Sequence, residues 1–246
     1  MIVITGGLGY LGGRIASFAL AQGHPVRIGS SRISPLIPDS LHACECMNID
    51  IMDTMSLRQV CAGATHVIHL ASLNAAQSNE NPDEARKVNI QGTKNILQAA
   101  QYSGCSNFVY LSTVHVYGSP LQGRLDEDST LDPIHPYAST HLEAEQLVIG
   151  AGNTGKLTTT ILRLTNAVGS PEAVAANCWT LVVNDICKQI VLRNNIQLRS
   201  SPSILRDFVP ISAVCEIVLG LIGNKKLQND VLNVSSGKSI TLLELA

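Results

Sequence analysis

The stretch VITGGLGYLGGRI, residues 3–15, decides the fold class, because a β-branched run passes into a glycine-rich loop and then into an amphipathic segment. Its glycines fit the dinucleotide-binding fingerprint either as Gly7-x-Gly9-x-x-Gly12 or, in a wider form, with Gly6 in first place. Glycines allow the tight turn, let a pyrophosphate approach the main chain, and aim the next helix N-terminus at the phosphates. We therefore expect a dinucleotide to be bound by these loop residues: Gly6, Gly9, Tyr10, Leu11 and Gly12.

Short β-branched runs alternate with longer amphipathic segments along the rest of the chain. This alternation predicts an α/β fold, a Rossmann-type doubly wound parallel sheet with helices on both faces. We expect residues 1–165 to form the dinucleotide-binding domain and residues 166–246 to mix late Rossmann elements with a small substrate lobe. The predicted strands are 1–5, 26–29, 66–71, 107–112, 158–164 and 231–234, and the predicted helices are 9–22, 54–62, 82–103, 137–150 and 178–193.

The composition argues against several classes of partner. The 246 residues carry 17 basic and 19 acidic side chains, for a net charge of −2, and 4% aromatic residues. No basic run exceeds Lys225-Lys226, and base-stacking surfaces need aromatics, so we expect no nucleic-acid partner. Seven cysteines without metal-ligand spacing predict reduced thiols and no metal site. No leader or membrane-spanning run is visible, so we expect a cytoplasmic protein with no membrane partner.

The segment PVRIGSSRIS, residues 25–34, ends the second predicted strand. An acidic residue usually holds the adenosine ribose there, but this chain has Ser30, Ser31 and Arg32. Small hydroxyls and a guanidinium suit a 2′-phosphate, which favours NADP over NAD, although Arg32 can equally be a solvated loop charge. Asp50 and Ile51, after the next strand, are candidates to contact adenine; a simple turn carboxylate is the alternative for Asp50.

Motifs further along the chain agree with one family in order and spacing. They are HVIHLAS (66–72), KVNIQGTKNILQAA (87–100), FVYLSTVHVYG (108–118), PYASTH (136–141), ILRLTNAVG (161–169), RDFVPIS (206–212) and LNVSSGKSITLLELA (232–246). With the glycine loop they resemble the extended short-chain dehydrogenase/reductase family, in its nucleoside-diphosphate-sugar epimerase/dehydratase branch. The resemblance implies an NAD(P) cofactor, further cofactor contacts by Leu70, Ala71 and Ser72, and a C-terminal substrate lobe shorter than in other members.

The resemblance also implies a catalytic set. A serine or threonine, a tyrosine and a lysine do the chemistry in this family, and the matching positions hold Thr113, Tyr137 and His141. Tyr137 would exchange the proton of a sugar hydroxyl while hydride moves between sugar and nicotinamide, and Thr113 would hydrogen-bond the same oxygen. His141 can reach the nicotinamide ribose, but an imidazole is mostly neutral at pH 7 and helps the tyrosinate little. Either the site is slower, or a neighbour raises the His141 pKa, or turnover has been lost. His115 and His135 flank the same region; we expect ordinary polar residues at loop edges, and assistance to the site is the alternative.

Three residues are expected at the substrate end: Ser112 beside Thr113, Asn166, and Arg206, whose guanidinium would clamp the nucleotide diphosphate. The resemblance favours an epimerase/dehydratase-type enzyme acting on a nucleotide-activated sugar. An NADPH-dependent ketoreductase and a catalytically silent NADP-binding module are the alternatives. Because two helices per subunit commonly form a dimer interface in this family, we expect a homodimer through 82–103 and 137–150.

Overall fold

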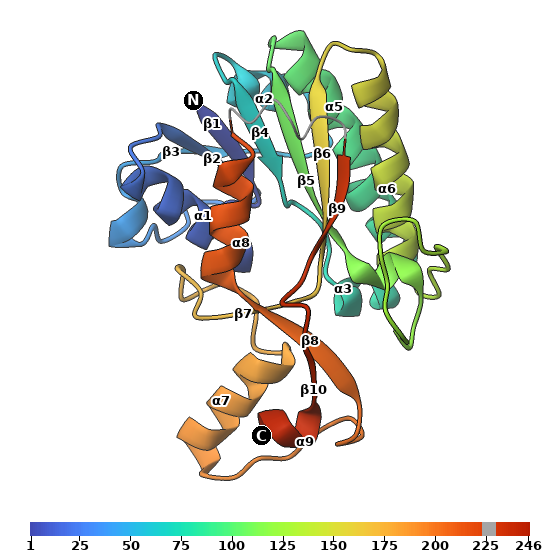
Figure 1. The fold of residues 1–246 in the computed structure, drawn as a ribbon. Helices are drawn as coiled ribbons and strands as arrows, with labels where there is room; N and C mark the ends of the chain where they lie inside the picture. The colour runs from blue at the N-terminus through green and yellow to red at the C-terminus, as the bar shows by residue number, and fades with distance from the viewer. Residues whose placement is uncertain (223–229) are drawn as a thin grey trace.

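The computed structural model describes residues 1–222 and 230–246. Its main element is a wholly parallel seven-stranded sheet of order β3-β2-β1-β4-β5-β6-β9, which confirms the predicted Rossmann-like α/β fold (Figure 1). The six predicted strands all form within two residues of their predicted ranges. The strands of this sheet are Ile2–Thr5 (β1), Val26–Ser30 (β2), Glu45–Asn48 (β3), His66–His69 (β4), Asn107–Thr113 (β5), Thr158–Leu164 (β6) and Asp230–Val234 (β9).

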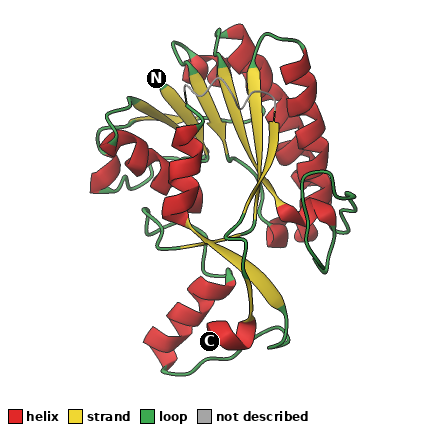
Figure 2. Ribbon diagram, viewed as in Figure 1, coloured by secondary structure: helices red, strands yellow, loops and turns green. Residues whose placement is uncertain are grey.

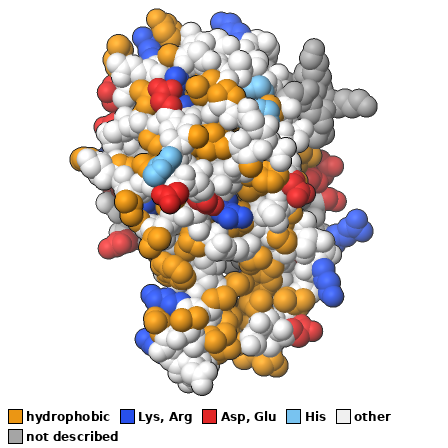
Figure 3. Space-filling view, turned by 90° about the vertical axis from the view of Figure 1, so that its left-hand side faces the viewer, with side chains coloured by type: hydrophobic (Ala, Val, Ile, Leu, Met, Phe, Trp, Pro, Cys, Tyr) orange, Lys and Arg blue, Asp and Glu red, His pale blue; other side chains and the backbone are white. Residues whose placement is uncertain are grey.

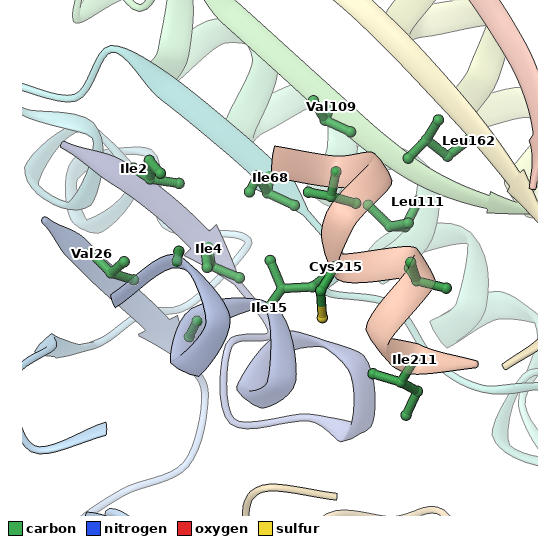
Figure 4. Packing of buried hydrophobic residues seen from close by; sticks show 14 of the residues in the cluster. Ile2, Ile4, Ile15, Val26, Ile68, Val109, Leu111, Leu162, Ile211 and Cys215 are labelled. Carbon is green, nitrogen blue, oxygen red and sulfur yellow. The ribbon is translucent and has the colours of Figure 1, made fainter. Parts of the chain in front are cut away.

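Helices cover both faces of this sheet, as the predicted alternation requires (Figure 2). On one face, α1 (Tyr10–Ala21) and α8 (Ile211–Gly220) bury Ile15 and Cys215 against Ile4 of β1 (Figure 4). On the other face, α2 (Thr54–Cys61), α5 (Gly92–Tyr102) and α6 (Pro136–Asn153) pack around a second core that contains Val3 and Phe108. Neighbouring strand residues such as Val3 and Ile4 therefore enter different cores, which is why the strands read as continuous apolar runs.

The helix predicted over 82–103 is composite. It consists of α4 (Pro82–Ala85), a π-helical turn over Arg86–Gln91 and α5, which follow one another without a break. The short helix α3 (Ala75–Glu80) precedes it, and a capping box at Asn74 fixes its first turn. Among the described residues, no helix combines the length and apolarity that a bilayer crossing requires.

A small lobe lies beyond the carboxyl ends of the main strands (Figure 1). Its sheet has the order β10-β8-β7, formed by Asn166–Val168 (β7), Leu205–Pro210 (β8) and Ser239–Thr241 (β10), with α7 (Val182–Arg193) and α9 (Leu242–Leu245) beside it. No strand was predicted between residues 164 and 231, but β8 forms there because it pairs with β7 and β10, which are distant in sequence. Figure 3 shows hydrophobic side chains over the lobe, and α7 exposes Val191 and Leu192.

Candidate functional site

The glycine loop between β1 and α1 has no room for side chains. Gly6 has a φ of +68°, which residues with a side chain rarely adopt, and its N–H donates to the Gly29 carbonyl over 2.9 Å. A Cβ atom on Gly12 would collide with the Gly6 carbonyl oxygen and lie 2.8 Å from the Gly7 Cα. The helix α1 begins after Gly9 without a side-chain cap, so its first N–H groups remain available to an anion. The loop thus offers bare main chain and a helix N-terminus, as phosphate binding requires.

A cavity of about 950 Å³ opens beside this loop, at the carboxyl ends of the strands where open parallel sheets bind ligands. Arg206 is not among its lining residues in the described part of the chain; its Nη1 donates to the Leu205 carbonyl over 3.1 Å. All other residues predicted from the sequence line the cavity: Gly6, Gly9, Tyr10, Leu11, Gly12, Ser30, Ser31, Arg32, Asp50, Ile51, Leu70, Ala71, Ser72, Ser112, Thr113, Tyr137, His141 and Asn166.

Arg32 lies in this cavity after the end of β2. Its guanidinium donates through Nη2 to the carbonyl oxygen of Ala175, 3.0 Å away, and Asn48 Nδ2 donates to the Arg32 carbonyl oxygen over 3.1 Å. Asp50 closes a turn by accepting from the Met52 N–H over 2.8 Å. Asp50 therefore has a hydrogen-bond partner within its own turn, and Arg32 has one on the segment between β7 and α7.

Thr113 and Tyr137 lie beside each other in the cavity wall, where the Thr113 hydroxyl affects the pKa of the phenol. Thr113 ends β5, and its Oγ accepts from the His115 N–H over 3.2 Å. Tyr137 is the second residue of α6, whose start is fixed by the His135 side-chain cap and by Pro136 at the first position. Burial raises the pKa of Tyr137, and the Thr113 hydrogen bond opposes this shift. The phenol is therefore protonated at neutral pH, and it can donate to an oxygen placed beside Thr113.

His141 lies one helical turn after Tyr137 and is neutral. Its Nδ1 donates to the Tyr137 carbonyl over 2.8 Å, and the two ring centroids are 4.2 Å apart. The side chain is nearly fully buried, and this burial lowers the pKa of His141 to about 4. The hydrogen bond to the Tyr137 carbonyl opposes this lowering of the pKa, whereas the charge of His115 adds to it. The alternative in which a neighbour restores the positive charge is therefore wrong for this structure.

Ser112 turns into the protein core. Its Oγ donates to Glu145 Oε1 over 2.5 Å, and Glu145 forms a buried ion pair with Arg163, with 2.7 Å between Oε2 and Nη2. Arg163 also donates to the Tyr117 hydroxyl over 2.8 Å. The Ser112 hydroxyl, predicted to contact substrate, thus holds β5 to α6. The sequence contained a signal for this network, because Arg163 stands inside an apolar strand and a buried charge needs a partner.

Asn166 joins the lobe to the main sheet. Its Nδ2 donates to the Asp207 carbonyl over 2.8 Å, while Thr165 Oγ donates to Asp207 Oδ1 over 2.9 Å. Tyr10 of the glycine loop reaches the same region, since its hydroxyl donates to the Gly169 carbonyl over 2.9 Å. Within residues 1–222 and 230–246, no group of three or more His, Cys, Asp or Glu side chains could hold a metal ion.

Comparison with known proteins relates the whole chain to one family. The model of the NAD dependent epimerase/dehydratase family matches residues 2–235. UDP-glucose 4-epimerase 4 of Oryza sativa subsp. japonica is 30% identical over 159 residues, which are 59% of this chain and 43% of that protein. The dTDP-glucose 4,6-dehydratase of Streptomyces niveus is 27% identical over 265 residues, covering 100% of this chain and 75% of that protein. The chain thus spans less than half of the first relative and three quarters of the second.

Two solved structures share the fold. An NAD dependent NDP-hexosamine 5,6-dehydratase involved in tunicamycin biosynthesis superposes with a TM-score of 0.83 at 27% identity, over 99% of this chain and 78% of that one. The UDP-glucose 4-epimerase of Thermotoga maritima, solved with UDP-glucose, superposes with a TM-score of 0.86 at 23% identity, over 99% of this chain and 79% of that one.

Proposed function

The chain belongs to the NAD dependent epimerase/dehydratase family, and we propose that it acts on a nucleotide-activated sugar by transient oxidation of a sugar carbon. The observation that carries this proposal is the position of the Thr113–Tyr137 pair, which lines the same cavity as the bare glycine loop. A phenol and a hydroxyl beside a dinucleotide can exchange a proton with a substrate oxygen while its carbon changes oxidation state. The relatives named above as epimerases and dehydratases take nucleotide sugars, which supports that substrate class.

The cavity residues fit a dinucleotide. The glycine loop and the first turn of α1 would hold the pyrophosphate, and the hydroxyls of Ser30 and Ser31 would hydrogen-bond the adenosine ribose. A Cβ on Gly6 would lie 3.1 Å from the Ala71 nitrogen, so only glycine lets the loop approach the segment after β4 this closely. Bound NAD would supply the acceptor for the sugar hydride.

NAD is the cofactor that we propose, although the sequence favoured NADP. The family description and the 5,6-dehydratase both name NAD. Arg32, the residue that suggested a 2′-phosphate, donates through Nη2 to the Ala175 carbonyl. The ketoreductase alternative rested on NADPH, so it loses its support with the NADP assignment.

Tyr137 would act as the acid and base toward the substrate oxygen, and Thr113 would orient that oxygen. Thr113 Oγ accepts the His115 N–H, so its own proton can be donated to the Tyr137 oxygen or to a substrate oxygen placed there. His141 would serve as a neutral ribose contact, since its Nδ1 donates to the Tyr137 carbonyl and its Nε2 keeps a lone pair. This arrangement lacks the cation of the family's usual lysine, so tyrosinate is scarce at neutral pH.

The scarcity of tyrosinate favours a second candidate function, a silent NAD-binding module. One experiment distinguishes the two candidates. The protein is incubated with NAD and either UDP-glucose or dTDP-glucose, absorbance at 340 nm follows the formation of NADH, and NMR follows the sugar. An enzyme gives NADH or a new sugar, and Tyr137→Phe abolishes this while calorimetry shows unchanged NAD affinity. Tyr102→Phe, at a 70% exposed tyrosine, is the matched control. NAD binding without any change in either sugar would favour the silent module and refute the enzyme.

A further inference from the structure

Residues 169–181 join β7 to α7, and we call this segment the strap. Both of the elements that it joins belong to the lobe, yet the strap runs back toward α1 of the dinucleotide-binding domain (Figure 1). Its last part lines the cavity through Asn177 and Leu181. The strap therefore forms one side of the cavity in which we place the dinucleotide.

Glu172 fastens the strap to the dinucleotide-binding domain with both of its carboxylate oxygens. Its Oε2 accepts from Nη1 of Arg14 on α1 over 3.1 Å, and its Oε1 accepts from the hydroxyl of Ser40 in the 3₁₀ turn Asp39–Leu41. The Glu172 side chain is 13% exposed. A Cβ atom on Gly13 would lie 3.0 Å from the Cβ of Glu172, so the strap packs closely on α1 at this point. A mostly buried carboxylate with two such partners is a stronger contact than an ion pair on the open surface.

Two further hydrogen bonds hold the strap on either side of Glu172. The Tyr10 hydroxyl donates to the Gly169 carbonyl over 2.9 Å, and Arg32 Nη2 donates to the Ala175 carbonyl over 3.0 Å. Tyr10 begins α1 and Arg32 follows β2, and both line the part of the cavity where we place the pyrophosphate and the adenosine ribose. The strap is therefore fixed along the cofactor half of the cavity.

The fastening groups of Glu172 lie outside the cavity itself. Among the described residues that line the cavity, none is Glu172, Arg14 or Ser40. These side chains would therefore not touch a dinucleotide bound there. Any effect of Glu172 on cofactor binding must act through the position of the strap.

We propose that the strap is a gate through which the dinucleotide enters and leaves the cavity, and that Glu172 is the positioning residue that keeps this gate closed. The proposal rests on the proposed function, since it takes the cavity as the NAD site. A closed gate would keep the reduced cofactor in place between oxidation of the sugar carbon and its re-reduction, which transient oxidation requires.

A gate has a kinetic signature that differs from that of a direct ligand contact. The cofactor passes only while the strap is detached, and the contacts of Glu172 are the same whether the cavity is filled or not. Loosening the strap therefore raises the rate constants of entry and exit by the same factor. The ratio of the two rate constants, which is the affinity, stays unchanged.

Stopped-flow fluorescence with the analogue 1,N6-etheno-NAD tests the gate. We expect Glu172→Gln to raise both kon and koff by about tenfold, at a Kd within about twofold of the wild type, because the variant loses a hydrogen-bonded charge. Arg14→Gln removes the other charge of the pair and should act alike, and the double variant should be no faster than either single variant. Glu45→Gln is the matched control: it breaks the ion pair with Arg27 at the opposite ends of β2 and β3, and should leave both rates unchanged.

Hydrogen exchange tests the fastening without any cofactor. The main-chain N–H of Ala176 donates to the Ala173 carbonyl over 2.9 Å within the strap. Mass spectrometry of a peptide that covers residues 170–178 follows the exposure of this segment. We expect it to exchange about tenfold faster in Glu172→Gln than in the wild type, and at the wild-type rate in Glu45→Gln.

Three results would overturn the gate alone: unchanged kon and koff in Glu172→Gln, a loss of affinity through koff with kon unchanged, or hydrogen exchange equal to that of the wild type. The second of these is the signature of direct contact with the ligand. Failure of the wild type to bind both etheno-NAD and NAD in calorimetry would instead refute the proposed cofactor, and the gate would fall with it.

Discussion

Replacing His141 with lysine should raise turnover at neutral pH. Burial lowers the His141 pKa from 6.5 to about 4. The same site would lower the pKa of a lysine too, but from a much higher ordinary value of about 10.4, so the lysine stays mostly charged at pH 7. An opposite charge within about 4–6 Å lowers the pKa of an acid by ~1–3 units. The rings of Tyr137 and His141 are 4.2 Å apart, so we expect at least about tenfold more tyrosinate and a similar gain in kcat.

The assay is a pH–rate profile of the wild type and of His141→Lys with the sugar nucleotide that turns over. The wild-type rate should rise with pH toward the raised pKa of Tyr137, and His141 should add no falling limb between about pH 5 and 8, because it is already neutral there. In His141→Lys the rising limb should move to lower pH by ~1–3 units. His141→Gln is the neutral control and should leave the limb in place. Superimposable profiles for lysine and wild type, at equal NAD affinity, would show that a charge at this position does not act on Tyr137.

Three further predictions concern binding, stability and assembly. Gly12→Ala should weaken NAD binding by about 100-fold in calorimetry, ~2.7 kcal/mol, because the new Cβ would meet the Gly6 carbonyl oxygen. Gly150→Ala, at a position with open space around it, is the control. Equal NAD affinities of Gly12→Ala and the wild type would contradict the assignment of the loop. Glu145→Ala should lower the free energy of unfolding by ~3–5 kcal/mol in urea titrations, because it strands the buried Arg163, and a loss below about 1 kcal/mol would mean that the pair is not held as described. The outward surfaces of α5 and α6 should form a homodimer, and a monomer in light scattering at micromolar concentration would disprove it.

The main sheet could be predicted because its signals are local. Each β-branched run, like the glycine loop, is recognised from a few neighbouring residues. Both ends of each of the six predicted strands lie within two residues of the predicted range. The lobe could not be predicted in the same way. Its strands β7 (NAV) and β10 (SIT) have three residues each, and β8 (LRDFVP) contains two charged residues and a proline. None of them shows the unbroken β-branched run that identifies a strand from the sequence.

The members of the site could be named from the sequence, but the direction of each side chain could not. The strand β5 is buried along nearly its whole length, so the alternation of sides gives no sign of which hydroxyl faces the cavity. Thr113 lines the cavity beside Tyr137, while the neighbouring Ser112 donates to Glu145 in the core. His115 was expected to be an ordinary loop-edge residue, and only the absence of a partner for its buried nitrogen distinguishes it from His135.

The charge state of the site depends on a row of rings that exists only in the folded chain. Behind His141 lies Tyr110 of β5 at 6.1 Å between centroids, and behind Tyr110 lies His69 of β4 at 5.7 Å. Burial lowers the pKa of His69 to about 3, so both histidines in the row are neutral at pH 7. A proton added to either histidine would create a buried positive charge. The carboxylate of Glu145, whose charge raises the pKa of Tyr110, does not offset that charge because it is already paired with Arg163. Packing therefore removes the charge from any imidazole at position 141, and a side chain needs the higher intrinsic basicity of lysine to remain charged there.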